Sequence, residues 1–295
     1  MSTILGIPVP VILGQLTLGL VNGSFYALLS LGLAVIFGLM GVVNFAHGAF
    51  YTLGAFAALL GLQHLGINYW VALLLAPLAV GLLGVLVERL LLRHLYGLDP
   101  LYGLLLTFGL ALIVEGSLHQ VFGASGQSYP VPESLSGALN LHFMFLPLYR
   151  AWVILASVVV CFSTWFVIER TRLGATLRAA TENAPLLQAF GVNVPLLVAA
   201  TYGGGVALAA LAGVLASPVV LVNSHMGTEL VIVVFAVVVI GGMGSILGSI
   251  ITGFGLGVIE GLTKVFYPEA SNTVIFIIMA IVLLIKPAGL FGRAR

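Results

Sequence analysis

The first charged side chain in this sequence is Glu88, so residues 1–87 contain no Asp, Glu, Lys or Arg. Soluble domains carry about 25% charged residues, whereas this chain of 295 residues carries 6% and is 61% hydrophobic. No soluble fold of this size could cover its surface with so few charges, but a lipid-facing surface could. The sequence therefore predicts an all-α integral membrane protein with several spans.

Apolar stretches of span length recur along the whole chain, separated by short polar breaks. A helix rises about 1.5 Å per residue and must cross about 30 Å of hydrocarbon. We expect a single transmembrane domain, 1–295, with about eight to ten helices, some of them broken or re-entrant. The expected spans lie near 24–40, 44–62, 69–87, 101–122, 151–168, 195–216, 226–241, 245–262 and 271–286, with 10–22 as a further candidate.

Two uncharged runs are too long for one upright helix. The run 10–40 would extend about 46 Å as a helix, and Asn22-Gly23-Ser24 predicts a break in it. The run 230–259 is interrupted by Gly241-Gly242-Met243-Gly244-Ser245, and three glycines in four residues disfavour a continuous helix. Non-helical backbone at membrane depth needs protein or water around it. We therefore interpret Gly241, Gly242 and Gly244 as backbone near a permeation path, and close helix packing is a compatible alternative.

Positive charge predicts the orientation of the spans. If residues 88–99 are cytoplasmic, then 169–194 and, with a break at 241–245, the C-terminus are cytoplasmic as well. This arrangement places eight of the ten Lys and Arg residues inside and leaves Arg150 and Lys264 outside, as the positive-inside rule favours. The longest outside loop, 123–149, is too small to form an independent domain.

Motifs for energy conversion and catalysis are absent from the sequence. Neither lysine, Lys264 or Lys286, follows a glycine, so there is no P-loop for ATP. Zinc-protease and serine-hydrolase signatures are also missing, and there is no basic tract for nucleic acid. We therefore predict a protein that moves a solute, without catalytic residues, metal or cofactor. A carrier or channel that works alone stays open as an alternative, since Glu115 lies within a span.

Four residues recur at an offset of 200 positions, which is a weak sign of an internal repeat. Many transporters are built from repeats with interrupted helices in matching positions. Chance matches in a glycine-rich apolar chain are the alternative. The recurring residues are Ser24, Gly41, Gly48 and Thr52, matched by Ser224, Gly241, Gly248 and Thr252.

The predicted cytoplasmic segment 169–194 is much longer than a tight turn and mixes charges with Leu177, Leu186, Leu187 and Phe190. We expect two short helices, one near 173–183 and one from Pro185 to Gly191, following the preference for Pro at helix starts and Gly past helix ends. One interpretation is an amphipathic helix on the bilayer surface. The other is a helix that docks into a soluble partner.

The sequence resembles the branched-chain amino-acid permease subunits of bacterial ABC importers over essentially its whole length. The resemblance rests on motifs in this order and spacing: Gly19-Leu-Val-Asn-Gly-Ser-Phe-Tyr-Ala-Leu28, Gly41-Val-Val-Asn-Phe-Ala-His-Gly48, Arg178-Ala with Asn183, Ala189 and Gly191-Val-Asn193, Ala210-Leu-Ala-Gly-Val-Leu-Ala216, and Gly241-Gly-Met-Gly-Ser-Ile-Leu-Gly248.

This resemblance implies a bacterial inner-membrane protein that pairs with a second, related permease subunit. Two cytoplasmic ATP-binding subunits and a periplasmic amino-acid-binding protein would complete the importer. Related permeases also serve urea and short amides, so the substrate stays open. Residues 172–193 match the family's ATPase-docking segment, although Pro185 departs from the expected pattern and would shorten the docking helix. The implied docking residues are Arg172, Gly174, Arg178, Glu182, Asn183, Pro185, Phe190 and Gly191.

Polar residues in or near the spans are the remaining path candidates. Asn44 and His47 lie where a cytoplasmic turn enters a span, and Asn44 is expected to cap that helix or, with His47 and Gly41, to line the path. Glu115 and His119 lie four residues apart on one helix face. We expect His119 to pair with Glu115, and a role for Glu115 in the path is the alternative.

Overall fold

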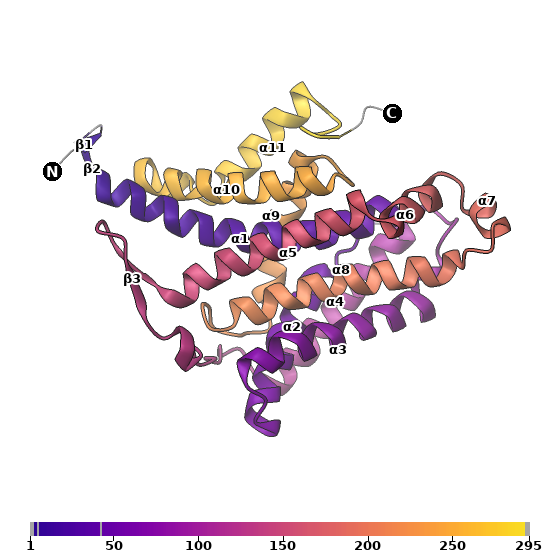
Figure 1. The fold of residues 1–295 in the computed structure, drawn as a ribbon, viewed down its shortest axis with the longest axis horizontal. Helices are drawn as coiled ribbons and strands as arrows, with labels where there is room; N and C mark the ends of the chain where they lie inside the picture. The colour runs from indigo at the N-terminus through magenta and orange to yellow at the C-terminus, as the bar shows by residue number, and fades with distance from the viewer. Residues whose placement is uncertain (1–2, 5, 42, 293–295) are drawn as a thin grey trace. The chain divides into compact units, whose positions relative to one another are not determined.

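The computed structural model describes residues 3–4, 6–41 and 43–292. The architecture is all-α, as predicted, with two very short β-hairpins (Figure 1). The α-helices are α1 (Val9–Met40), α2 (His47–Leu65), α3 (Tyr69–Leu90), α4 (Pro100–Phe122), α5 (Leu148–Arg170), α6 (Arg172–Glu182), α7 (Ala184–Ala189), α8 (Val194–Ala216), α9 (Met226–Gly241), α10 (Ile246–Phe266) and α11 (Val274–Ile285). The short elements are β1 (Thr3–Ile4), β2 (Ile7–Pro8), η1 (Leu92–His94), η2 (Glu133–Leu135), β3 (Ala138–Asn140), β4 (Phe145–Pro147) and η3 (Pro268–Ala270).

Seven helices of the described residues are long and apolar enough to cross a membrane, namely α1, α2, α3, α4, α5, α8 and α10. The apolar helices α9 and α11 are shorter. A polytopic membrane protein is therefore confirmed.

The chain divides into two compact units. The first comprises residues 1–30, 130–161 and 233–295, and the second comprises 31–129 and 162–232. The first unit contains the start of α1, the hairpin of β3 and β4, α10 and α11. The second contains α2, α3, α4, α6, α7 and α8.

Glycines allow the helices of the second unit to pack closely. In α2, a Cβ at Gly54 would overlap the backbone of Ala210 in α8, and a Cβ at Gly213 would overlap Tyr51. Helix α3 contacts the same helix, where Gly84 faces Val206. Small residues bring membrane helices together because lipid supplies no hydrophobic force between them. The core of this unit is therefore the packing of α2 and α3 against α8.

The predicted helix break at Asn22-Gly23-Ser24 is wrong, because α1 runs unbroken over 32 residues, a length of about 48 Å. Asn22 Nδ2 donates to Glu260 Oε1 at 3.4 Å, and the Ser24 hydroxyl donates to the Leu20 carbonyl at 2.9 Å. A Cβ at Gly23 would press on the backbone of Phe254. Asn22 and Gly23 therefore fit α1 against α10 within the first unit, while Ser24 bonds within α1.

The break predicted at 241–245 is confirmed. Helix α9 ends at Gly241, and α10 begins at Ile246, where the Ser245 side chain accepts a hydrogen bond from Gly248 N at 3.1 Å. Gly242 has φ +99°, a left-handed conformation that residues with a Cβ rarely adopt. A Cβ at Gly242 would also overlap the backbone of Gly292. The glycine is thus required both by the backbone and by the close approach of the C-terminal segment.

Candidate docking segment and permeation path

Helices α6 and α7 form the predicted pair of short helices between the end of α5 and the start of α8 (Figure 1). Helix α6 turns back on α5, because a Cβ at Gly174 would overlap the Ile168 carbonyl. Asn183 Oδ1 accepts from Leu186 N at 3.0 Å and caps α7, as capping side chains do. Pro185 lies in the first turn of α7, which has six residues. This segment therefore has a defined shape.

The docking candidates differ in what they contact. Arg178 Nη1 donates to the Ile168 carbonyl at 2.6 Å and lies 3.6 Å from Glu169 Oε2, so it ties α6 to α5. Glu182 and Phe190 are exposed, and Phe190 reaches 77%. Arg172 begins α6, and Gly191 follows the end of α7. The Arg178 side chain is also 48% exposed, so it and the other exposed members are available to a partner.

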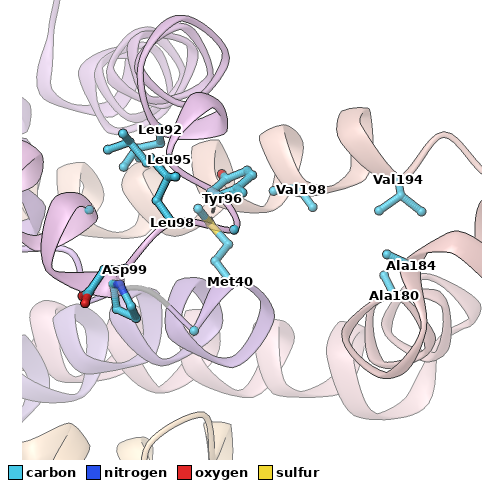
Figure 2. A pocket seen from close by; sticks show the side chains of 14 residues that line it. Met40, Leu92, Leu95, Tyr96, Leu98, Asp99, Ala180, Ala184, Val194 and Val198 are labelled. Carbon is cyan, nitrogen blue, oxygen red and sulfur yellow. Dashed lines mark hydrogen bonds between the residues drawn. The ribbon is translucent and has the colours of Figure 1, made fainter.

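A cavity of about 370 Å³ lies beside this segment within the second unit. Figure 2 shows Tyr96 next to Met40 on one side of the cavity, with Ala180 and Ala184 of α6 and α7 on the other. The Tyr96 hydroxyl lies 3.9 Å from Met40 Sδ. The cavity thus separates the docking segment from the end of α1 and from the connection between α3 and α4.

The Tyr96 hydroxyl also donates to Glu88 Oε1 at 2.8 Å. Glu88 is a buried acid near the end of α3. Burial, and then the bond to Glu88, raise the pKa of Tyr96 well above its ordinary value. The pair therefore favours a protonated Tyr96 that satisfies the buried carboxylate.

A second cavity of about 570 Å³ is lined by Arg89 and Arg93 together with Ala184 and Gln188 of the α7 region. Its lining comes from the two regions that positive charge assigns to the cytoplasmic side. These regions lie together at one end of the second unit, which agrees with that assignment.

The path candidates Asn44 and His47 are buried at the start of α2. Asn44 Oδ1 accepts from Ala46 N at 3.1 Å. The N-cap of α2 is Ala46, without a side-chain capping bond, so Asn44 orders the turn before the helix and does not cap it. The preceding connection, which starts at Gly41, is held by α4, since Phe45 N donates to Thr107 Oγ1 at 3.1 Å. Thr107 thus ties the residues just before α2 to α4 within the second unit.

Glu115 has different partners from the one expected. His225 Nδ1 lies 2.7 Å from Glu115 Oε1, and the Thr228 hydroxyl donates to Glu115 Oε2. His119 instead lies 3.5 Å from the Ser224 hydroxyl, with its ring centroid 5.5 Å from that of His225. Glu115 thus links α4 to the start of α9.

The other path candidates, Gly241, Gly242 and Gly244, form the break between α9 and α10 in the first unit. Leu290 N donates to the Ile240 carbonyl at 2.8 Å, and Phe291 N donates to the Gly241 carbonyl at 3.1 Å. The C-terminal segment therefore covers this break. Among the described residues, no three His, Cys, Asp or Glu side chains gather closely enough to hold a metal ion.

Comparison with known proteins identifies the family. The family described as "Branched-chain amino acid transport system / permease component" matches residues 15–283. The chain belongs to this permease family. No solved structure matches it.

Three curated relatives align with this permease over nearly the whole length of both chains. The high-affinity branched-chain amino acid transport system permease protein BraD of Pseudomonas aeruginosa is 30% identical over 95% of this chain and 96% of its own. The corresponding protein LivH of Escherichia coli is 28% identical over 95% and 96%. A probable branched-chain amino acid transport permease protein LivH of Methanocaldococcus jannaschii is 26% identical over 92% and 90%.

Sequence reasoning missed the buried acid Glu260 of this permease. Glu260 Oε2 accepts from the Tyr26 hydroxyl at 2.7 Å, and Oε1 accepts from Lys264 Nζ at 2.5 Å and from Asn22. Two signals could have found it: Asn22 and Tyr26 share a face of α1, and Glu260 and Lys264 share a face of α10. Both pairs lie within apolar stretches, where polar residues need partners.

Proposed function

We propose that this permease is the membrane-spanning subunit of an ABC importer for branched-chain amino acids in the inner membrane of a bacterium. Separate cytoplasmic ATPases drive the transport, because the chain has no P-loop of its own. A second related permease subunit and a periplasmic amino-acid-binding protein complete the assembly. The relatives support the substrate, since BraD and LivH are branched-chain amino acid transport system permease proteins.

The observation that carries the proposal is the segment of α6 and α7. It has a defined fold, is anchored to α5 by Gly174 and Arg178, and exposes Leu186 and Phe190. Large apolar side chains on a short polar segment outside the spans mark a protein contact. We therefore assign 172–193 as the surface on which an ATPase docks.

In this assignment the segments 88–99, 169–194 and the C-terminus lie in the cytoplasm, and 123–149 lies outside. Two findings support it. Arg89 and Arg93 share a cavity with α7, and Gln127 pairs with Val222 at the ends of α4 and α8 that lie away from that cavity. With these sides fixed, counting spans back from residues 88–99 places the N-terminus outside.

The transport cycle would couple the docking segment to the two connections that interrupt the spans. ATP-driven approach of the ATPases would push α6 and α7 toward Tyr96 and Met40 and close the cavity between them. The path candidates are then Gly41 and Asn44 before α2 with His47 at its first position, Gly241, Gly242 and Gly244 at the break between α9 and α10, and Glu115 in α4. A change in contacts between the two states supplies the coupling free energy.

The docking test uses the exposed phenylalanine of the segment. Phe190→Ser should abolish co-purification of the ATPases with the permease and leave its melting temperature unchanged, because Phe190 is 77% exposed. Phe145→Ser is the matched control, since Phe145 is 71% exposed on the hairpin of β3 and β4. Equal ATPase recovery with both variants would contradict the proposal.

The substrate test uses reconstituted vesicles with the ATPases and binding protein. ATP-dependent uptake of leucine, isoleucine and valine should exceed uptake of urea and short amides. A carrier that works alone is the second candidate, favoured by the ionisable Glu115 and His225 pair in and beside a span. Gradient-driven uptake by the purified permease without ATPases would support that candidate instead.

A further inference from the structure

Among the buried polar groups of the second unit that lack a hydrogen-bond partner in the described residues, two lie close together. They are the Asn44 side-chain nitrogen Nδ2 and the Tyr202 hydroxyl. Asn44 is 1% exposed and Tyr202 is 0% exposed. Buried polar groups are almost always paired, and an unpaired donor destabilises the fold. In a transporter, such groups point to a ligand that they bind during part of the cycle.

The Asn44 amide is held at the N-terminus of α2. Its Oδ1 accepts from Ala46 N, so the orientation of the amide is fixed by a donor and leaves Nδ2 free to donate. Helix α2 has 19 residues, and its N-cap Ala46 makes no side-chain capping bond. The first N–H groups of a helix and its dipole favour a negative charge at this end.

Tyr202 projects from α8 to the same place. Its ring packs edge-to-face on Phe50, in the first turn of α2, with centroids 6.4 Å apart and an interplanar angle of 85°. Its hydroxyl lies near enough to the Asn44 amide to interact with it. Two buried polar groups from different elements therefore meet at the start of α2, close to each other but without a hydrogen bond of ordinary geometry.

The 370 Å³ cavity in Figure 2 belongs to the same unit, although neither Asn44 nor Tyr202 is part of its lining. Its lining includes Val198, which precedes Tyr202 by one helical turn, and Gly41, which precedes Asn44 by three residues. Residues four apart on a helix share a face. Pockets for small molecules have volumes of about 300–1,000 Å³. The wall of the cavity thus lies about one helical turn from Tyr202 along α8.

We propose that Asn44 Nδ2, the Tyr202 hydroxyl and the backbone N–H groups that follow His47 in the first turn of α2 form a transient binding site for the carboxylate of the transported amino acid. This inference rests on the proposed function and adds a recognition element to the permease itself. All of these donors are uncharged, so the carboxylate is held weakly. Weak binding suits a transporter, because a translocation site must also release its solute.

The transport test removes one donor without changing the packing. Tyr202→Phe should lower ATP-dependent leucine uptake about tenfold, while the melting temperature of the complex stays the same or rises, because an unpaired buried hydroxyl is lost. Tyr129→Phe is the matched control, since the Tyr129 hydroxyl is also buried without a partner among the described residues. It should leave uptake unchanged. Unchanged uptake in Tyr202→Phe would overturn the site.

The binding test identifies the carboxylate and needs no transport. Leucine should raise the melting temperature of the purified ATP-free complex, lacking the binding protein, whereas isoamylamine, which is leucine without its carboxylate, should not. Asn44→Asp keeps the acceptor for Ala46 N but replaces the donor with an oxygen, and it should abolish the leucine shift. Equal shifts with both compounds, or no shift with leucine, would refute the site. If the wild-type complex instead shows this shift but takes up no leucine, the proposed function alone fails.

Discussion

At the scale of single residues, Glu260 shows how this permease tolerates an acid among apolar helices. The side chain is 5% exposed, and a buried carboxylate without partners would be very unfavourable. Tyr26, Asn22 and Lys264 supply three donors to it. Because Tyr26 and Asn22 belong to α1 and Glu260 belongs to α10, the cluster holds two glycine-lined helices in one register.

Replacing Glu260 should therefore be costly. Glu260→Leu leaves Lys264 and Tyr26 without their acceptor, and we expect it to lower the free energy of unfolding by about 3 kcal/mol. Adding Lys264→Met should recover part of this loss, because the unpaired cation is removed as well. Glu269→Gln, at an exposed acid beside the same helix, should change stability by less than about 0.5 kcal/mol. Unfolding in mixed detergent micelles measures all three, and equal effects at Glu260 and Glu269 would show that the cluster is unimportant.

At the scale of helices, glycine has two distinct roles in α8. Gly213 lies against Tyr51 and Ala55 of α2, so a side chain there would force the two helices apart. For Gly204, on the same helix, no atom of the described residues beyond its own stretch of helix backbone lies within 4 Å of where its Cβ would be. The first glycine is thus required for packing, and the second only lowers the intrinsic stability of the helix.

These roles predict opposite outcomes for the same substitution. Gly213→Ala should lower the free energy of unfolding by about 1–3 kcal/mol, the usual effect of overpacking. Gly204→Ala should be neutral or raise it by up to about 1 kcal/mol, because Ala is the better helix former. Melting temperatures of the purified permease compare the two. If Gly204→Ala proved the more damaging, the position would have to contact something outside this chain.

At the scale of the whole molecule, local signals in the sequence were enough to locate most helix ends. Asn183 before Pro185 marks the start of α7, and Ser245 after three glycines marks the start of α10. Long-range partners could not be read in this way. The sequence Asn22-Gly23-Ser24 predicts a helix break, but Glu260, 238 residues from Asn22, accepts a hydrogen bond from the Asn22 side chain inside a continuous helix. The spacing in α4 predicts His119 as the partner of Glu115, but the structure pairs Glu115 with His225, 110 residues away. The docking and path residues remain predictions for the same reason, because their partners are not part of this chain.

The orientation in the membrane is the prediction that joins these scales, since it decides which end of the second unit meets an ATPase. Helix α4 begins near Arg89 and Arg93 and ends at Phe122, so residues after it should emerge on the opposite side of the membrane from α7. The single Cys161 is buried, and Cys161→Ala gives a background without thiols. Adding Ser125→Cys to it should allow labelling by an impermeant maleimide in spheroplasts. Adding Gln188→Cys instead should allow labelling only after the membrane is opened. In the proposed orientation α7 lies in the cytoplasm, on the same side as the positively charged loops. The reverse pattern would place the docking segment outside the cell, where no ATP is available, and would contradict both the orientation and the proposed drive.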